Sequence, residues 1–328
     1  MTRTGDRPSR LTLIANPAAG GGLGRRLAEG VAGRLSALMP DTRIRTLLSR
    51  SWADAEARLA EEVGQSLEDP DPGSRAVVVM GGDGMAHLGL NAVAGTPIRL
   101  GVIPAGTGND FCRGTGLPGR VGAAVAAIAS GRSGTVDLAR VTGLVRTADG
   151  LAEGSRWVGS VVSTGYDARV NHGANELRLR LGSLSYAYVA LRELSRFAPL
   201  HYRIETDGRA RELDAMLIAV GNAGWIGGGM QICPGADVTD GRLDLTIIHP
   251  CSRGTLVRAL GSVYTGGFVR LSIVERLRAR SVTVDGEGLV AMADGEDLGR
   301  VPLRIECVPG ALNLLGAGAR PQHRGPTH

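Results

Sequence analysis

The stretch Ala76-Val77-Val78-Val79-Met80-Gly81-Gly82-Asp83-Gly84 joins an apolar run directly to a glycine-rich turn. The same arrangement recurs where Arg99–Ile103 leads into Pro104-Ala105-Gly106-Thr107-Gly108-Asn109-Asp110. A continuous apolar, β-branched run is typical of a buried parallel strand. Consecutive glycines let backbone N–H groups surround phosphate oxygens, and a helix that follows adds its positive end. The two turns therefore predict a phosphate-binding pocket at the ends of two strands.

Strands and helices are expected to alternate around these turns. The spacing of apolar residues predicts further strands at Leu11–Ala15 and Arg43–Leu48, and helices at 25–38, 53–63, 85–94 and 122–130. A surface loop is expected over 66–74. This alternation predicts an α/β domain over residues 11–135 with a doubly wound parallel sheet, whose ligands bind beyond the carboxyl ends of the strands.

The pattern changes from about residue 136, where strand-like stretches are separated by turns. The stretches lie at 136–145, 156–163, 201–206, 213–220, 243–248, 281–284 and 303–308. Helices are expected at 176–197 and 254–264, a loop at 147–155, and a mobile tail at 316–328. A second, mostly β domain is therefore predicted over 136–315, and two domains suit a chain of 328 residues.

The basic residues are informative because all 37 are arginine. Without lysine, the chain cannot be a Walker A nucleotidase, a protein kinase or a pyridoxal enzyme. Phosphate charge must be met by backbone dipoles, arginine, or a divalent metal held by carboxylates. The net charge of +5 favours anionic surfaces, although an arginine-rich soluble surface explains it equally well.

The cysteines and the hydropathy of the sequence indicate where in the cell the protein is expected to lie. The four cysteines, Cys112, Cys233, Cys251 and Cys307, have no spacing that could frame a zinc site, so we expect reduced thiols in a cytoplasmic protein. No run approaches the length of an apolar membrane span, and the N-terminus is polar. Membrane contact is therefore expected to be peripheral.

Five motifs, in this order, carry a resemblance to a known family: Asn16-Pro-Ala-Ala-Gly20, Gly81-Gly-Asp-Gly84, Leu100–Phe111, Gly221–Gly229 and Asp294-Gly-Glu296. The set resembles the diacylglycerol kinase catalytic-domain family, which includes bacterial lipid kinases and sphingosine kinases, over residues 11–315. The resemblance implies an NAD kinase-like α/β domain and a β-sandwich domain that enclose an active cleft. It also implies a lipid kinase that uses ATP and Mg²⁺.

The resemblance implies the following nucleotide-binding residues: Asn16, Pro17, Ala18, Ala19, Gly20, Arg26, Ser49, Gly81, Gly82, Asp83, Gly84, Met85, Gly106, Thr107 and Asn109. Asp83 would order the phosphate loop or its Mg²⁺, with a turn-capping aspartate as the alternative. Asn109 could instead close an Asx turn. Arg26 and Arg178 match phosphate-binding positions, although a solvated helix face accounts for both.

Two Asp-Gly-Glu triplets compete for the catalytic role that the resemblance implies. We choose Asp294 and Glu296, because only this triplet stands just before a strand and the ending Val308–Leu315. Asp285-Gly-Glu287 has the composition of a hairpin turn. Asp294 would accept the proton of the lipid hydroxyl, and Glu296 would orient that hydroxyl or help to place metal.

The resemblance further implies a structural Mg²⁺ held by Asp237, Asp240 and a nearby carbonyl, taken as that of Arg242; an acidic β-turn is the alternative. Three residues depart from the family pattern. Met85 stands where the family usually has threonine, and Leu88 where glutamate is common. Gly21 occupies a position that can be lysine in the family. No catalytic or binding role is predicted for His87.

The leading expectation is an ATP- and Mg²⁺-dependent lipid kinase that acts on diacylglycerol at a membrane surface, with a homodimer left open. A sphingosine-type kinase and a catalytically weakened nucleotide- and lipid-binding regulator are the alternatives. NAD kinases and phosphofructokinases share Gly81–Gly84 but fit the later motifs poorly. A Rossmann dehydrogenase lacks its glycine fingerprint here, and nucleic acid is not expected as a partner because aromatic platforms are missing.

Overall fold

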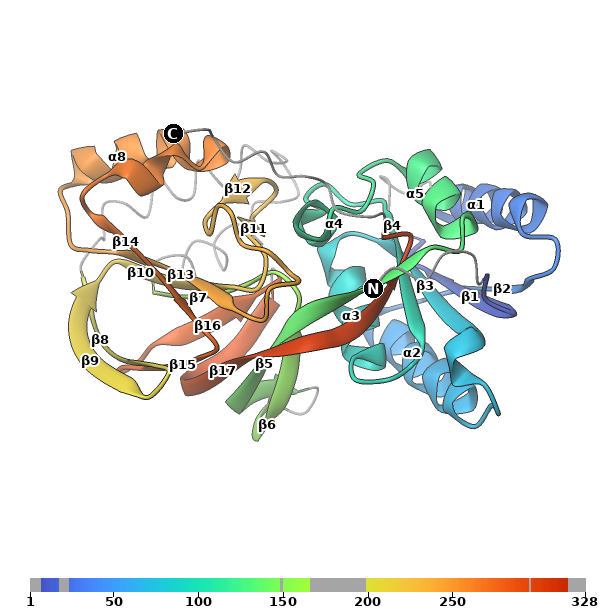
Figure 1. Cartoon of the computed structure of the whole chain (residues 1–328), viewed down its shortest axis with the longest axis horizontal. Helices are drawn as coiled ribbons and strands as arrows, with labels where there is room; N and C mark the ends of the chain where they lie inside the picture. Colours follow the sequence, from blue (N-terminus) through green and yellow to red (C-terminus); the bar gives the residue numbers. More distant parts are fainter. Residues whose placement is uncertain (1–6, 18–23, 148–149, 166–198, 295, 318–328) are drawn as a thin grey trace. The chain divides into compact units, whose positions relative to one another are not determined.

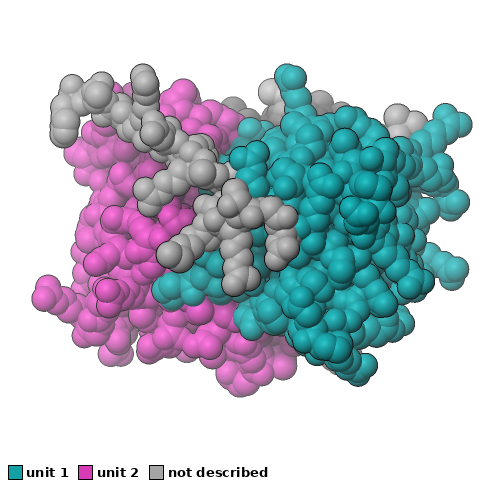
Figure 2. Space-filling view, turned by 45° about the vertical axis from the view of Figure 1, so that its right-hand side comes forward, with its two compact units in different colours: residues 1–137, 309–328 teal, residues 138–308 magenta. Residues whose placement is uncertain are grey.

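The computed structural model describes residues 7–17, 24–147, 150–165, 199–294 and 296–317 (Figure 1). The chain divides into two compact units (Figure 2). Unit 1 contains residues 1–137 and 309–328, and unit 2 contains residues 138–308. The second domain was predicted to extend to residue 315. Residues from 309 onward instead belong to unit 1, because Asn313–Leu315 pair with a strand of its sheet.

Unit 1 is built on a parallel sheet. Its strands are β1 (Arg10–Ala15), β2 (Arg43–Leu48), β3 (Arg75–Gly81), β4 (Arg99–Pro104) and the last residues of β17 (Glu296–Leu315). β1 pairs with β2 and β3, β3 pairs with β4, and Asn313–Leu315 of β17 pair with β4, all in parallel. The order is therefore β2-β1-β3-β4-β17. Every residue of β3 and β4 is buried, as their apolar sequences predict.

Helices cover both faces of this sheet (Figure 1). They are α1 (Gly24–Leu38), α2 (Trp52–Leu67), α3 (Asp83–Val93), α4 (Asp110–Thr115) and α5 (Val121–Ala129), with a short 3-10 helix at Pro72–Ser74. α1 buries Ala28, Val31 and Leu35 in a core that it shares with α5, as helical spacing requires. α2 and α3 pack together on the opposite face. The predicted doubly wound sheet is confirmed.

Unit 2 is a β-sandwich. Its strands are β5 (Ser133–Thr147, entering from unit 1), β6 (Gly150–Val158), β7 (Val161–Gly165), β8 (Leu200–Thr206), β9 (Arg209–Ala215), β10 (Leu217–Gly221), β11 (Trp225–Ile226), β12 (Met230–Gln231), β13 (Leu243–Ile248), β14 (Val274–Ala279), β15 (Ser281–Asp285), β16 (Val290–Ala293) and β17. An antiparallel path runs β14-β13-β10-β7-β16-β17, and β17 also pairs with β5 and β15. A core that includes Val162, Tyr202, Leu245 and Ile305 fills the sandwich.

One further layer covers this unit. α8 (Arg253–Ser262), with the 3-10 helices Val263–Thr265 and Gly267–Arg270, packs over a second apolar cluster that includes Val161, Ala219 and Phe268. In the described part of the chain, no helix has both the length and the hydropathy that crossing a membrane would require.

Several boundaries differ from the prediction. Most of the loop expected over 147–155 instead belongs to β6, with Thr147 opposite Gly150 and β6 running on to Val158. The stretches expected at 156–163 and 213–220 are each broken between two strands. β14 and β16 were not predicted. The helix expected over 176–197 and the tail from 318 onward lie outside the described residues.

Candidate active site

The two glycine turns leave the same edge of the sheet of unit 1. Gly81, the last residue of β3, is the register partner of Pro104, the last residue of β4. The amide of Ala105 donates to the carbonyl of Gly81 over 2.8 Å. Because parallel strands end at a common edge, the turns that follow lie side by side, as ligand-binding loops do in this class of fold.

The turns are in backbone contact, and only glycine permits it. A Cβ on Gly106 would lie 2.4 Å from Cα of Gly82, and a Cβ on Gly81 would lie 2.5 Å from Cγ of Met85. The first contact brings main chain against main chain. The second explains Met85, whose side chain is buried over Gly81. Met85 therefore shapes the turn through its packing.

One side chain links the first turn to the segment after the second, and another closes the second turn on itself. Asp83 Oδ1 accepts a hydrogen bond from the amide of Phe111 over 3.1 Å. Asn109 has a φ of 57°, and its side chain exchanges two hydrogen bonds with the backbone of Gly106, at 2.9 and 3.2 Å. These bonds match the Asx-type alternative for Asn109. Asp83 and Asn109 thus hold the loops in shape.

The amino end of α3 supplies positive electrostatic potential to this edge. Gly82 is the N-cap with extended backbone, and its carbonyl accepts from the amides of Met85 and Ala86. The first turn of a helix directs N–H groups outward and carries partial positive charge. Gly106 and Thr107 are exposed beside it. An anion of phosphate size is therefore favoured here.

The ends of β1 and β2 lie along the same edge. The amide of Asn16 donates to the carbonyl of Met80 over 3.1 Å. Ser49 is buried, and its hydroxyl donates to the carbonyl of Ala15 over 3.3 Å. Arg26 is exposed on α1. Ala18, Ala19, Gly20 and Arg178 lie outside the described residues.

One thiol lies beside this site. Burial, reinforced by the negative charge of Asp83, raises the pKa of Cys112 to about 12. Cys112 therefore stays protonated at neutral pH and is not a nucleophile.

Asp294 stands in the turn between β16 and β17 of unit 2. It has a φ of 49°, in the left-handed region that costs a non-glycine residue energy. Its carboxylate accepts from the amides of Gly159 and Ser160, over 3.2 and 3.0 Å. Such strain and paired amide bonds orient a carboxylate, which is what a positioned general base requires.

Asn222, for which no role was predicted, supports this arrangement. It is 1% exposed, and its side-chain amide donates to the carbonyl of Gly159 over 3.1 Å. The backbone amides of Asn222 and Ala223 both donate to the carbonyl of Ser160. An asparagine that follows a fully buried strand, within the motif Gly221–Gly229, was the available signal.

The other carboxylates of the two triplets can also be placed. Glu296 begins β17 and is exposed. Asp285 ends β15, and its Oδ1 accepts from the amide of Gly286 over 2.8 Å. The prediction of a hairpin at 285–287 was wrong, because β15 pairs with β8 and β17 while β16 pairs with β7 and β17. The triplet connects two strands that do not pair with each other.

The carboxylates predicted to hold a structural metal have protein partners. Asp237 Oδ1 accepts from the amide and the hydroxyl of Thr239, over 3.0 and 2.6 Å. Asp240 accepts from the amide of Arg242 over 3.0 Å and forms an ion pair with Arg278. Within the described ranges, His, Cys, Asp and Glu form no group of three that could hold a metal ion. The metal site stays a prediction, and Mg²⁺ would have to displace the Arg278 guanidinium.

Comparison with known proteins finds a family match for each half of the chain. The diacylglycerol kinase catalytic domain matches residues 10–141, and the YegS C-terminal NAD kinase beta sandwich-like domain matches residues 160–316. A diacylglycerol kinase of Mycobacterium tuberculosis (strain CDC 1551 / Oshkosh) is 37% identical over 316 residues, which cover 96% of each chain. This chain belongs to the diacylglycerol kinase family. The resemblance stated from its motifs is confirmed.

Two further matches agree with this family. A probable lipid kinase, YegS-like, of Xanthomonas axonopodis pv. citri (strain 306) is 31% identical over 96% of this chain and 98% of its own length. The crystal structure of a diacylglycerol kinase from Bacillus anthracis str. Sterne superposes with a TM-score of 0.68 at 20% identity, covering 94% of this chain and 96% of that chain. The solved structure confirms the fold of this diacylglycerol kinase family member.

Proposed function

We propose that the protein is an ATP- and Mg²⁺-dependent lipid kinase that transfers the γ-phosphate of ATP to diacylglycerol and forms phosphatidic acid. The observation that carries the proposal is the main-chain contact between Gly82 and Gly106, which joins two glycine turns at the amino end of α3. Family membership supports the reaction type. The acceptor is approached at a membrane surface, where a peripheral cytoplasmic protein of net charge +5 is attracted to anionic lipids.

The chain suits a triphosphate because its anion-binding groups are backbone amides. The contact between Gly82 and Gly106 keeps side-chain atoms out of the place where the turns meet. Phosphoryl transfer depends mainly on alignment and on neutralising charge spread over the phosphoryl oxygens. The hydrogen bond from Phe111 to Asp83 keeps both turns in register while they bind. Lysine is not needed for this mode of binding.

Asp294 supplies the base in this proposal. The lipid hydroxyl oxygen attacks the γ-phosphorus, the bond to the β–γ bridging oxygen breaks, ADP leaves, and the hydroxyl proton passes to the carboxylate of Asp294. The amides of Gly159 and Ser160 hold that carboxylate in one orientation, and Asn222 holds their loop. A carboxylate has about four lone-pair sites and can accept several hydrogen bonds at once.

The residues at the glycine turns can bind Mg²⁺ that arrives as a complex with the nucleotide. Mg²⁺ is usually held by one or two carboxylates together with phosphate oxygens and water, so no group of three protein ligands is required. Asp83 is the carboxylate at the phosphate loop that would complete its coordination. When bound, the ion supplies charge neutralisation at the phosphate oxygens.

A direct assay tests the proposal. The purified protein is incubated with γ-labelled ATP, Mg²⁺ and a panel of lipid acceptors, including diacylglycerol and sphingosine, in mixed micelles. Labelled phosphatidic acid is the expected product. Labelling of sphingosine alone would replace the acceptor but keep the reaction type. No labelled lipid from any acceptor, together with ATP binding by calorimetry, would show a regulator and defeat the proposal.

A further inference from the structure

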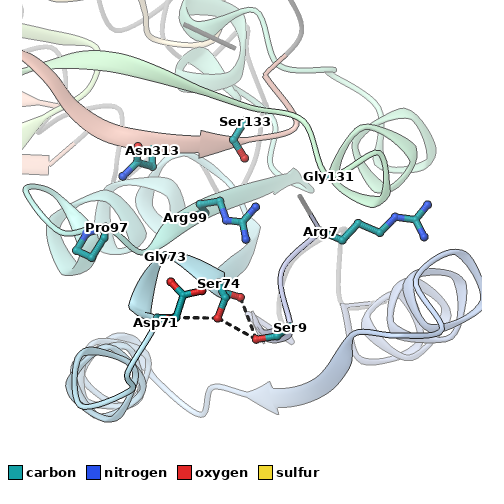
Figure 3. A pocket seen from close by; sticks show the side chains of 10 residues that line it. All are labelled: Arg7, Ser9, Asp71, Gly73, Ser74, Pro97, Arg99, Gly131, Ser133 and Asn313. Carbon is teal, nitrogen blue, oxygen red and sulfur yellow. Dashed lines mark hydrogen bonds between the residues drawn. The ribbon is translucent and has the colours of Figure 1, made fainter. Parts of the chain in front are cut away.

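A polar cavity of about 360 Å³ opens in unit 1 at the edge opposite the glycine turns (Figure 3). Its lining includes Ser9 before β1, Ser74 before β3, and Arg99 at the start of β4. These positions mark the amino ends of the parallel strands, whereas Gly81 and Pro104 mark the carboxyl ends. The volume lies in the lower part of the range for small-molecule sites. No function described above uses this cavity.

The cavity carries an excess of positive charge. Two guanidinium groups, those of Arg7 and Arg99, line it against the single carboxylate of Asp71. Arg99 is only 8% exposed, and Figure 3 shows its guanidinium group between Ser133 and Ser74. The planar fork of a guanidinium group matches the oxygens of a phosphate group. The lining charge therefore selects an anion.

Hydroxyl groups add neutral donors to this charge. Ser133 Oγ is buried and makes no hydrogen bond within the described part of the chain, although Ser133 lines the cavity. A buried hydroxyl without a partner is unfavourable and indicates a polar occupant. Asn313 also lines the cavity, and its amide nitrogen already donates to the carbonyl of Thr96 over 3.2 Å.

Local contacts hold the walls in place. Ser74 Oγ donates to the carbonyl of Asp71 over 2.8 Å and lies 3.0 Å from Ser9 Oγ (Figure 3). Gly131 has a φ of +70°, and a Cβ there would lie 2.9 Å from Cγ of Arg7. Only glycine at 131 therefore lets the Arg7 segment pass this close. The site is built from the fold and does not depend on surface side chains alone.

We propose that this cavity binds a small phosphate ester that carries a free hydroxyl group, either as a soluble molecule or as a lipid headgroup. Arg99 and the Ser133 hydroxyl bind the phosphate oxygens, and Arg7 adds charge at the rim. Asp71, which is exposed, accepts a hydrogen bond from the hydroxyl of the ester. The site is separate from the glycine turns and binds its ligand whether or not the chain transfers phosphate.

Titration calorimetry of the full chain without ATP tests this site, with glycerol 3-phosphate as the probe and glycerol as its uncharged counterpart. Glycerol 3-phosphate should bind and glycerol should not. Ser133→Ala should weaken binding by about tenfold or more, since a hydrogen bond to a charged group is lost. Arg99→Gln should weaken it further. Arg120→Ala, an exposed arginine of the same unit, is the matched control and should bind as the parent does.

A second arm distinguishes the two sources of the ester. Phosphatidylcholine vesicles with and without phosphatidylglycerol, whose headgroup carries free hydroxyl groups, are sedimented with each variant. If Ser133→Ala lowers recruitment to the phosphatidylglycerol vesicles, the ligand is a headgroup; if only the soluble titration changes, the ligand is a free ester. Should Arg99→Gln fail to fold, Ser133→Ala still decides. Equal binding of both probes by Ser133→Ala and Arg120→Ala would overturn the proposal.

Discussion

Replacing Gly106 with alanine tests the contact between the two glycine turns. The φ of Gly106 lies outside the left-handed region, so alanine can adopt the same backbone and only the contact changes. The new Cβ would lie 2.4 Å from Cα of Gly82, 3.1 Å from its nitrogen and 3.2 Å from Oδ1 of Asn109. Ordinary contacts of a Cβ begin near 3.4 Å. The turns must therefore separate by about 1 Å.

That separation predicts a larger effect on the rate than on stability. Overpacking of this kind costs about 1–3 kcal/mol in the free energy of unfolding. A misplacement of about 1 Å at a phosphate-binding site costs about a hundredfold in kcat/KM. The variant should therefore remain folded, with most of its diacylglycerol phosphorylation lost. Labelled ATP and diacylglycerol in mixed micelles give kcat and KM for ATP, and thermal unfolding measures stability in parallel.

Gly119→Ala is the matched control for this experiment. Gly119 is exposed, and a Cβ there would meet nothing within 4 Å. Its rate and Tm should equal those of the parent protein. If Gly106→Ala phosphorylates diacylglycerol as fast as Gly119→Ala does, the contact between the turns has no part in catalysis and the reasoning fails.

Three further predictions concern single groups. Asp83→Ala removes the acceptor of the Phe111 amide and should lower the free energy of unfolding by about 1–3 kcal/mol in urea titrations while raising KM for ATP; an unchanged KM would argue against its role. Burial raises the pKa of Cys233 from 9.0 to about 12, so the folded state favours the neutral thiol. The contribution of this thiol to the free energy of unfolding is complete below pH 9.0 and is lost as pH rises to about 12. Ionisation of Cys233 should cost about 3 kcal/mol near pH 11. In urea titrations across pH, Cys233→Ala should remove this share of the dependence and leave the share that comes from Cys112. Chelation of divalent metal should stop phosphorylation reversibly, yet leave Tm within about 2 °C, because Arg278 already balances Asp240; a larger fall in Tm would support a structural metal there.

Much of unit 1 could be predicted because its signals are local. The apolar run of β3 ends in glycines, and α3 begins at once, so strand, turn and helix follow from neighbouring residues. The contact between Gly82 and Gly106 could not be predicted in this way. It depends on the register of β3 against β4, which only the folded sheet provides.

Unit 2 was harder to predict because its pairings are distant in sequence. The amides that hold Asp294 come from residues 159 and 160, more than a hundred positions earlier. β14 lies at the end of the sheet path and carries a glutamate and two arginines, so its composition did not predict a strand. β9 is mostly exposed and shows no apolar alternation. Such strands are recognised only through their partners.

The role of Asp294 is tested most directly by comparing kcat for diacylglycerol phosphorylation in Asp294→Asn and Asp285→Asn. Both substitutions remove one carboxylate charge from an Asp-Gly-Glu triplet in unit 2. We expect Asp294→Asn to lose at least about a hundredfold in kcat, as the loss of a general base does, while Asp285→Asn retains the parent rate. Full activity in Asp294→Asn, or an equal loss in Asp285→Asn, would contradict the assignment.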